Sequence, residues 1–144
     1  MPHRLEVTLK PELLDPEGEA LRRKARDYFG TELHAVRSVQ ILTIDADLSA
    51  EQLATIRREV FTNPVTQVSA YAPLPIDFDW CLWVGFRPGV RDNAGATAVE
   101  AIEDILGIRL QPGEAVYTSK RYCLKAAGLT AADAERIAGA LLAN

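Results

Sequence analysis

The stretch Lys10–Gly18, with the sequence KPELLDPEG, returns 77 residues later as Arg87–Gly95, with the sequence RPGVRDNAG. Both copies place a cation before a proline, then an aspartate, and three residues after the aspartate a glycine. A spaced match at a constant offset is typical of an internal repeat. The sequence therefore predicts a tandem duplication.

The repeated motif predicts a joint at which a strand ends and a helix begins. Each proline lacks the N–H that a strand ladder needs, so the strand should end near it. Each aspartate suits the N-cap of the following helix. Each glycine falls in the first helical turn, where its propensity is poor, so we expect close packing against a strand. The six structural residues of the motif are Pro11, Asp15, Gly18, Pro88, Asp92 and Gly95.

The cation of each motif could help to bind an anion at the start of the following helix. Lys10 or Arg87 beside a helix N-terminus would suit a bound anion. The alternative is a purely structural joint with a solvated cation. The second interpretation is favoured, because an aspartate at the N-cap already occupies the free N–H groups.

In each half, the sequence pattern predicts alternating strands and helices. We expect a helix from about 16 to 29, another after the N-cap Ser49, and their counterparts after Asp92 and Thr130. The predicted strands are 4–9, 36–45, 65–71, 81–86 and 115–124.

These elements predict a two-layer α+β sandwich of tandem β-α-β-α-β repeats related by a pseudo-twofold axis. The first repeat spans 3–75, with a stiff linker at 72–75, and the second spans 76–144. The second repeat should lack its last strand. We expect the resulting unpaired sheet edge to favour association with another chain.

Trp83 lies on the side of its strand that faces away from the helices. A tryptophan on an uncovered sheet face would be exposed to solvent, so we expect the two copies to pack against each other on this face. The alternative is an exposed tryptophan.

Length, net charge and cysteine content make some classes of protein function less probable than others. The chain has 144 residues and a net charge of −4, which disfavours a dedicated nucleic-acid binder. No apolar run approaches the roughly 20 residues of a membrane span, and the N-terminal stretch Met1–Arg4 lacks the apolar region of a signal peptide. We therefore expect a cytoplasmic protein without a membrane partner. Cys81 and Cys123 form neither a metal-binding spacing nor a disulfide framework, and we expect reduced core or half-buried thiols.

No catalytic constellation emerges from the sequence, and no metal site is predicted. His3 and His34 lack a partner at a recurring spacing, and they are expected at the surface. Ser38 and Ser119 recur between the halves, but no histidine accompanies both. No Walker loop or dinucleotide-binding fingerprint is present.

The quoted motifs resemble a known family. Val7–Pro11 followed by Leu14–Gly18 resembles the opening of PurS, the small subunit of phosphoribosylformylglycinamidine (FGAM) synthase. Gly85–Val90 and Glu114–Ser119 resemble the second PurS-like copy in fused, long-chain synthases.

The resemblance implies an accessory role in purine biosynthesis. The family reaction converts formylglycinamide ribonucleotide, glutamine and ATP into FGAM, glutamate, ADP and phosphate. In the family, ATP and Mg²⁺ act in the large synthase domain, and a glutaminase supplies ammonia. No residue here matches a motif of either enzyme part. We therefore expect no cofactor in this chain, and the synthase and glutaminase as its partners.

Three other functions stay open. A tandem ACT-like regulatory domain has similar alternation, but it usually needs a hairpin between its helices, where this sequence predicts one strand. A surface for single-stranded RNA is faintly suggested by Tyr117, Arg121 and Tyr122, although the acidic balance argues against it. A self-sufficient enzyme is disfavoured by the lack of acid, base and nucleophile pairings.

Overall fold

A computed structural model describes residues 2–85 and 92–142 of the chain. Its strands are β1 (His3–Leu9), β2 (Ala35–Asp45), β3 (Gln67–Ala70), β4 (Trp80–Gly85) and β5 (Ala115–Lys125). Its helices are α1 (Pro16–Phe29), α2 (Ala50–Ile56), α3 (Asn93–Leu106) and α4 (Ala131–Leu142), and α2 continues into a π-helical turn, η1 (Arg57–Phe61). The predicted α+β class is confirmed.

The five strands form one antiparallel sheet in the order β3-β1-β2-β5-β4. Its longest ladder joins β2 to β5, from Ala35 opposite Lys125 to Asp45 opposite Ala115. The middle pair of that ladder is Gln40 and Lys120. The two halves of the chain therefore meet edge to edge, through the second strand of each.

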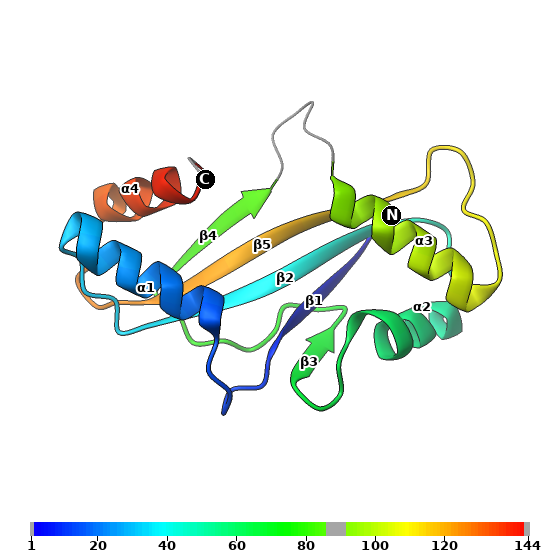
Figure 1. The fold of residues 1–144 in the computed structure, drawn as a ribbon, viewed down its shortest axis with the longest axis horizontal. Helices are drawn as coiled ribbons and strands as arrows, with labels where there is room; N and C mark the ends of the chain where they lie inside the picture. Colours follow the sequence, from blue (N-terminus) through cyan, green and yellow to red (C-terminus); the bar gives the residue numbers. More distant parts are fainter. Residues whose placement is uncertain (1, 86–91, 143–144) are drawn as a thin grey trace.

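All four helices cover one face of this sheet, in two pairs (Figure 1). Helices α2 and α3 lie over one end, and α1 and α4 lie over the other. The first core contains Leu5, Val7, Leu42, Ile44, Ile56, Ala98, Ile102 and Val116. The second contains Leu21, Ala25, Val36, Leu82, Tyr122, Leu124, Ala134 and Ile137. Each core thus combines a helix and strands from both halves of the chain.

The expected packing of the two copies around Trp83 is wrong. Trp83 does project from the face without helices, but the halves join through strand edges rather than through that face. Its side chain is 52% exposed, and the Arg4 guanidinium lies 4.1 Å from its ring centroid. An edge-to-edge ladder satisfies backbone groups of both halves, which a face-to-face contact would not.

The face without helices is partly covered by the segment 71–79, which connects the two halves. Leu74 and Ile76 of this segment pack against a small cluster formed by Val39, Ile41 and Cys123. The predicted linker is therefore part of the fold, because its apolar side chains close the second face of β2 and β5.

Two elements differ from the prediction by more than a one-residue shift at an end. β3 begins at Gln67 rather than Val65, because the Asn63 carbonyl accepts hydrogen bonds from the N–H groups of Thr66 and Gln67 and holds a turn there. The second helix changes to a π-helical turn after Ile56, and Val60 and Phe61 both pack on the first core. A single strand, β2, separates α1 from α2, as predicted. Among the described residues, no helix is long and apolar enough to cross a membrane.

Tyr71 provides a test of this arrangement at alkaline pH. Its hydroxyl donates a 2.7 Å hydrogen bond to the Leu53 carbonyl, and burial raises the pKa of Tyr71 to about 12. Because the folded state keeps a proton that the unfolded state loses near pH 10, this contribution to stability is present below pH 10 and is lost as pH rises to about 12.

We expect Tyr71→Phe to lose about 1 kcal/mol at neutral pH, through the missing hydrogen bond. We also expect its stability to decline less steeply than that of the wild type between pH 10 and 12. Urea unfolding across this pH range measures both effects. Parallel curves for the two proteins would contradict the assignment.

Candidate functional site

The first copy of the motif fastens α1 to the middle of the sheet. Asp15 is the N-cap of α1, and its carboxylate accepts the N–H of Gly18 at 3.1 Å. The same carboxylate accepts the backbone N–H of Ser38 in β2 at 2.6 Å, and the Ser38 hydroxyl at 2.9 Å. Asp15 therefore joins a helix end to a neighbouring strand, in addition to capping the helix.

The second copy makes the same contacts with α3 and β5. Asp92 accepts the N–H of Gly95 at 2.8 Å, and the N–H and hydroxyl of Thr118 at 2.6 and 2.7 Å. Burial opposes ionisation of Asp92, but the N–H groups of Thr118 and Gly95 and the Thr118 hydroxyl outweigh it and hold the pKa of this carboxyl below its usual value.

The hydroxyl that corresponds to Ser38 is that of Thr118, although Ser38 and Ser119 are the residues of the same type that recur between the halves. The offset between the halves is 77 at the motif, 80 along the strand and 81 at the next helix cap. The extra residues of the second half are thus divided between the loops before and after β5. A repeat matched only at motifs and caps does not reveal this division.

Removal of either aspartate should destabilise the protein by more than an ordinary cap does. We expect Asp15→Ala and Asp92→Ala to cost about 2 kcal/mol each, because each loses a helix cap and leaves a strand N–H without its acceptor. Ser49→Ala is the matched control, since Ser49 only caps α2, through the N–H of Gln52. Chemical unfolding compares the three. Equal losses of unfolding free energy in all three variants would contradict the proposed role of Asp15 and Asp92 in joining helix to strand.

An anion site at the start of α1, the less favoured of the two interpretations, is not assembled around Lys10. The hollow beside that helix end, about 400 Å³, is lined by Asp15, Pro16 and Glu17 among others, and Lys10 is not part of its lining. Asp15 also occupies the Gly18 N–H that an anion would need. The second candidate, Arg87, and Pro88 lie outside the described residues.

Lys10 instead lines a separate groove of about 370 Å³ with Arg57 and Arg58. The pairing of β1 with β3 brings Lys10 to this place, and the π-helical turn η1 supplies the two arginines. Three cations around one groove suit a carboxylate or phosphate group. The sequence did not indicate this grouping, because it depends on strand pairing between distant segments.

The hollow beside the start of α1 continues along the helix side of the sheet towards the first turn of α3. Two adjoining cavities of about 400 and 520 Å³ share Gln40 and Lys120 in their linings. The ammonium of Lys120 contacts both carboxylate oxygens of Glu17, at 2.8 and 3.0 Å, and so connects the halves. Burial disfavours the charged ammonium, but Glu17 outweighs burial and raises the pKa of Lys120.

The face without helices holds a buried ion pair that the sequence did not predict. Glu6 and Arg121 are 1% and 5% exposed, and their side chains meet at 2.6 Å. Glu6 also accepts the N–H of Leu74 at 3.1 Å and contacts Arg4 at 2.6 Å. Burial works against the charge of Glu6, but Leu74, Arg121 and Arg4 together lower the pKa of its carboxyl.

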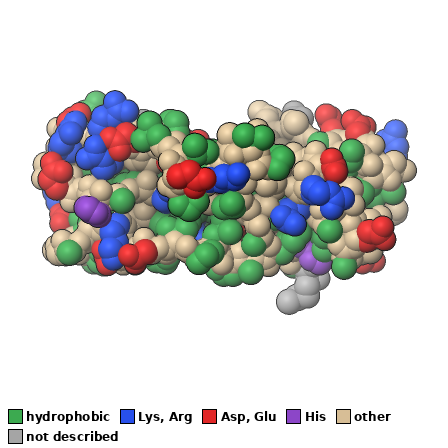
Figure 2. Space-filling model, turned by 90° about the horizontal axis from the view of Figure 1, so that it is seen from below, with side chains coloured by type: hydrophobic (Ala, Val, Ile, Leu, Met, Phe, Trp, Pro, Cys, Tyr) green, Lys and Arg blue, Asp and Glu red, His purple; other side chains and the backbone are tan. Residues whose placement is uncertain are grey.

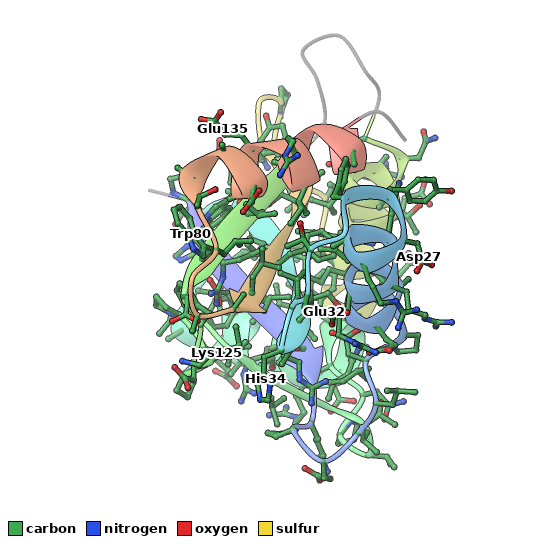
Figure 3. The ribbon with its side chains drawn as sticks, turned by 90° about the vertical axis from the view of Figure 1, so that its left-hand side faces the viewer. Asp27, Glu32, His34, Trp80, Lys125 and Glu135 are labelled. Carbon is green, nitrogen blue, oxygen red and sulfur yellow. The ribbon has the colours of Figure 1, made fainter. Side chains whose placement is uncertain are left out.

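The remaining candidate residues are dispersed. His3 is half-buried at the start of β1, and His34 is exposed in the loop before β2, close to Lys125 (Figure 3). Within 2–85 and 92–142, no group of three or more His, Cys, Asp and Glu side chains could hold a metal ion.

The suggested RNA-stacking surface is not formed. Tyr117 and Arg121 project from the face without helices, whereas Tyr122 is buried in the second core, beneath α1 and α4. Figure 2 shows Lys and Arg side chains interspersed with Asp and Glu side chains on the face that it displays. Such a mixture offers no continuous basic track for a nucleic-acid backbone.

Comparison with known proteins relates the first half of the chain to a protein family. The family model of PurS, described as phosphoribosylformylglycinamidine (FGAM) synthase, matches residues 3–72, which contain β1, α1, β2, α2 and β3. No curated protein and no solved structure matches the chain. Residues 3–72 therefore form a PurS-like domain, and this similarity relates that half of the chain to FGAM synthase and to purine biosynthesis.

Proposed function

We propose that the chain is a non-catalytic accessory domain that braces the synthase and glutaminase parts of FGAM synthase. The observation that carries this proposal is the PurS match over residues 3–72. In the proposed assembly, ATP and Mg²⁺ act in the synthase domain, ammonia comes from the glutaminase, and this chain contributes surfaces rather than reacting groups.

The second half, in this proposal, is a further PurS-like unit, so that one chain takes the place of a symmetric dimer. Three equivalences support it. Asp15 and Asp92 make the same contacts, and a carbonyl of the adjacent strand lies against Gly18 and Gly95 alike. The helix pairs are also mixed, since each core takes one helix from each half.

We propose that the synthase domain docks on the sheet face that carries no helices. Three aromatic side chains are exposed on or over it: Trp83 at 52%, Tyr117 at 54% and Phe78 at 41%. The Arg4 guanidinium stacks on Trp83. Exposed aromatic residues with a neighbouring arginine are typical of the residues that dominate binding energy at protein interfaces.

Trp83→Ala tests this docking face. We expect a stability change of at most about 1 kcal/mol, because only an exposed cation–π contact is lost, together with binding to a synthase core at least tenfold weaker. Tyr28→Ala is the matched control, since Tyr28 is 76% exposed on α1, on the opposite side of the molecule. Titration calorimetry with a synthase core that lacks its N-terminal domain compares them. Equal affinities for both variants would move the docking face elsewhere.

A second copy of the chain is the other proposed partner, through the outer edge of β4. In the described part of the chain, no strand pairs with β4 on the side away from β5. An open edge presents unpaired N–H and carbonyl groups to another strand. Sedimentation velocity over a concentration series distinguishes self-association from a chain that stays monomeric.

A further inference from the structure

The sheet register places the two cysteines of the chain directly opposite each other. Cys81 in β4 pairs with Cys123 in β5, and opposite residues of an antiparallel ladder project from the same face. Their Cα atoms are then roughly 4.5–5.5 Å apart, within the range of about 4.4–6.8 Å that disulfides require.

The surroundings of the pair make the two cysteines unequal. Cys123 is 2% exposed, beneath Leu74 and Ile76, whereas Cys81 is only half-buried. Burial raises the pKa of the Cys123 thiol to about 11, against the effect of Arg121. Cys81 is therefore the thiol that a reagent in solution reaches first.

Arg121 supplies a positive charge beside the Cys123 sulfur atom. Its guanidinium donates a 3.0 Å hydrogen bond to the Cys123 sulfur and also interacts with Cys81. Its buried Nε has no hydrogen-bond partner among the described residues. A guanidinium beside a thiol stabilises the thiolate, which is the form that attacks a disulfide.

We propose that Cys81 and Cys123 are a reversible redox pair, which closes into an intrachain disulfide between the edge strand and its neighbour. The oxidant in this proposal is a small-molecule disulfide of the glutathione type. The geometry meets the conditions that separate a redox pair from two unrelated thiols: a short Cα separation, one shared face, one accessible sulfur and a neighbouring cation.

The reaction proceeds in two exchange steps. The Cys81 thiolate attacks one sulfur of the small disulfide, which forms a mixed disulfide and releases one small thiolate. The Cys123 thiolate then attacks the Cys81 sulfur and releases the second small thiolate. The two protons of the protein thiols end on the two released thiols. Two protein thiols are thus oxidised, and one small disulfide is reduced.

Equilibration of the full chain in a series of reduced and oxidised glutathione tests the proposal. After acid quenching and alkylation, we expect the two thiols to disappear together, in a monomer that carries no glutathione. Peptide mapping should place the bond between Cys81 and Cys123. Because the bond closes a loop of about 40 residues, the oxidised chain should melt about 5–10 °C higher.

Two variants separate the steps. Cys123→Ser should stop at the mixed disulfide on Cys81, and Cys81→Ser should leave Cys123 unmodified. For the wild type, three outcomes would overturn the proposal: both thiols alkylated at every ratio, a stable glutathione adduct on Cys81, or a disulfide between two chains. The wild-type result decides the question even where a variant fails to fold.

Discussion

Gly18→Ala is expected to destabilise the protein by about 3 kcal/mol or more, although alanine is the better helix former. A Cβ at position 18 would lie well inside 3.0 Å of the Val36 carbonyl oxygen, closer than real Cβ atoms approach. The obstacle is the backbone of β2, which cannot rotate away as a side chain would. The first turn of α1 would have to lift off the strand, and the hydrogen bonds between Asp15 and Ser38 would lengthen.

Gly95→Ala should have a similar effect, because its Cβ would meet the Val116 carbonyl oxygen in the same way. Gly139→Ala in α4 is the matched control: nothing lies within 4 Å of its added Cβ, and alanine there should stabilise the protein by about 0.5–1 kcal/mol. Urea unfolding of the three variants measures the differences. Losses below 1 kcal/mol at both 18 and 95 would contradict the close approach of helix and strand.

Arg121→Met is expected to cost about 3–5 kcal/mol, because it leaves the Glu6 carboxylate buried without its main partner. Methionine fills a similar volume, so the loss reports on charge rather than on a cavity. Adding Glu6→Leu in the same chain should recover most of the loss, since an apolar pair replaces the isolated charge.

Arg58→Met is the matched control, because the Arg58–Glu59 pair is exposed on both sides and should contribute less than about 0.5 kcal/mol. The pH dependence gives an independent check. The lowered pKa of Glu6 stabilises the folded wild type above the ordinary carboxyl range near 4.5, and this contribution is lost as pH falls. The difference between the wild type and Arg121→Met should therefore shrink as pH falls below 4.5. A constant difference would mean that packing, and not charge, carries the effect.

Local features of the fold could be predicted from the sequence. The alternation in β1, the N-caps Asp15 and Asp92, and the tight contacts of Gly18 and Gly95 all depend on neighbours close in the chain or on a repeated motif. Such features need no knowledge of which distant strands pair.

The way in which the halves join could not be predicted by the same reasoning, although a signal was present. β2 carries apolar residues on both faces, with Leu42 and Ile44 towards the helices and Val39 and Ile41 away from them. A strand that is apolar on both faces belongs inside a sheet and not at its edge.

The buried ion pair and the cysteine pair depend wholly on long-range register. Glu6 and Arg121 are 115 positions apart, and they meet only because β2 and β5 are neighbours. Cys81 and Cys123 are brought together by the ladder between β4 and β5. Neither pair has a sequence spacing by which it could be recognised. The residues that meet on this face could therefore be identified only from the structure.

The most direct test of the accessory-domain proposal is catalytic complementation. The chain is mixed with an FGAM synthase core that lacks its N-terminal domain, and glutamine-dependent ADP release is measured with formylglycinamide ribonucleotide, ATP and Mg²⁺ present. We predict turnover for the mixture and none for either piece alone, with Trp83→Ala restoring less turnover than Tyr28→Ala. A mixture in which the folded chain binds the core without restoring turnover, or does not bind it at all, would contradict the proposal.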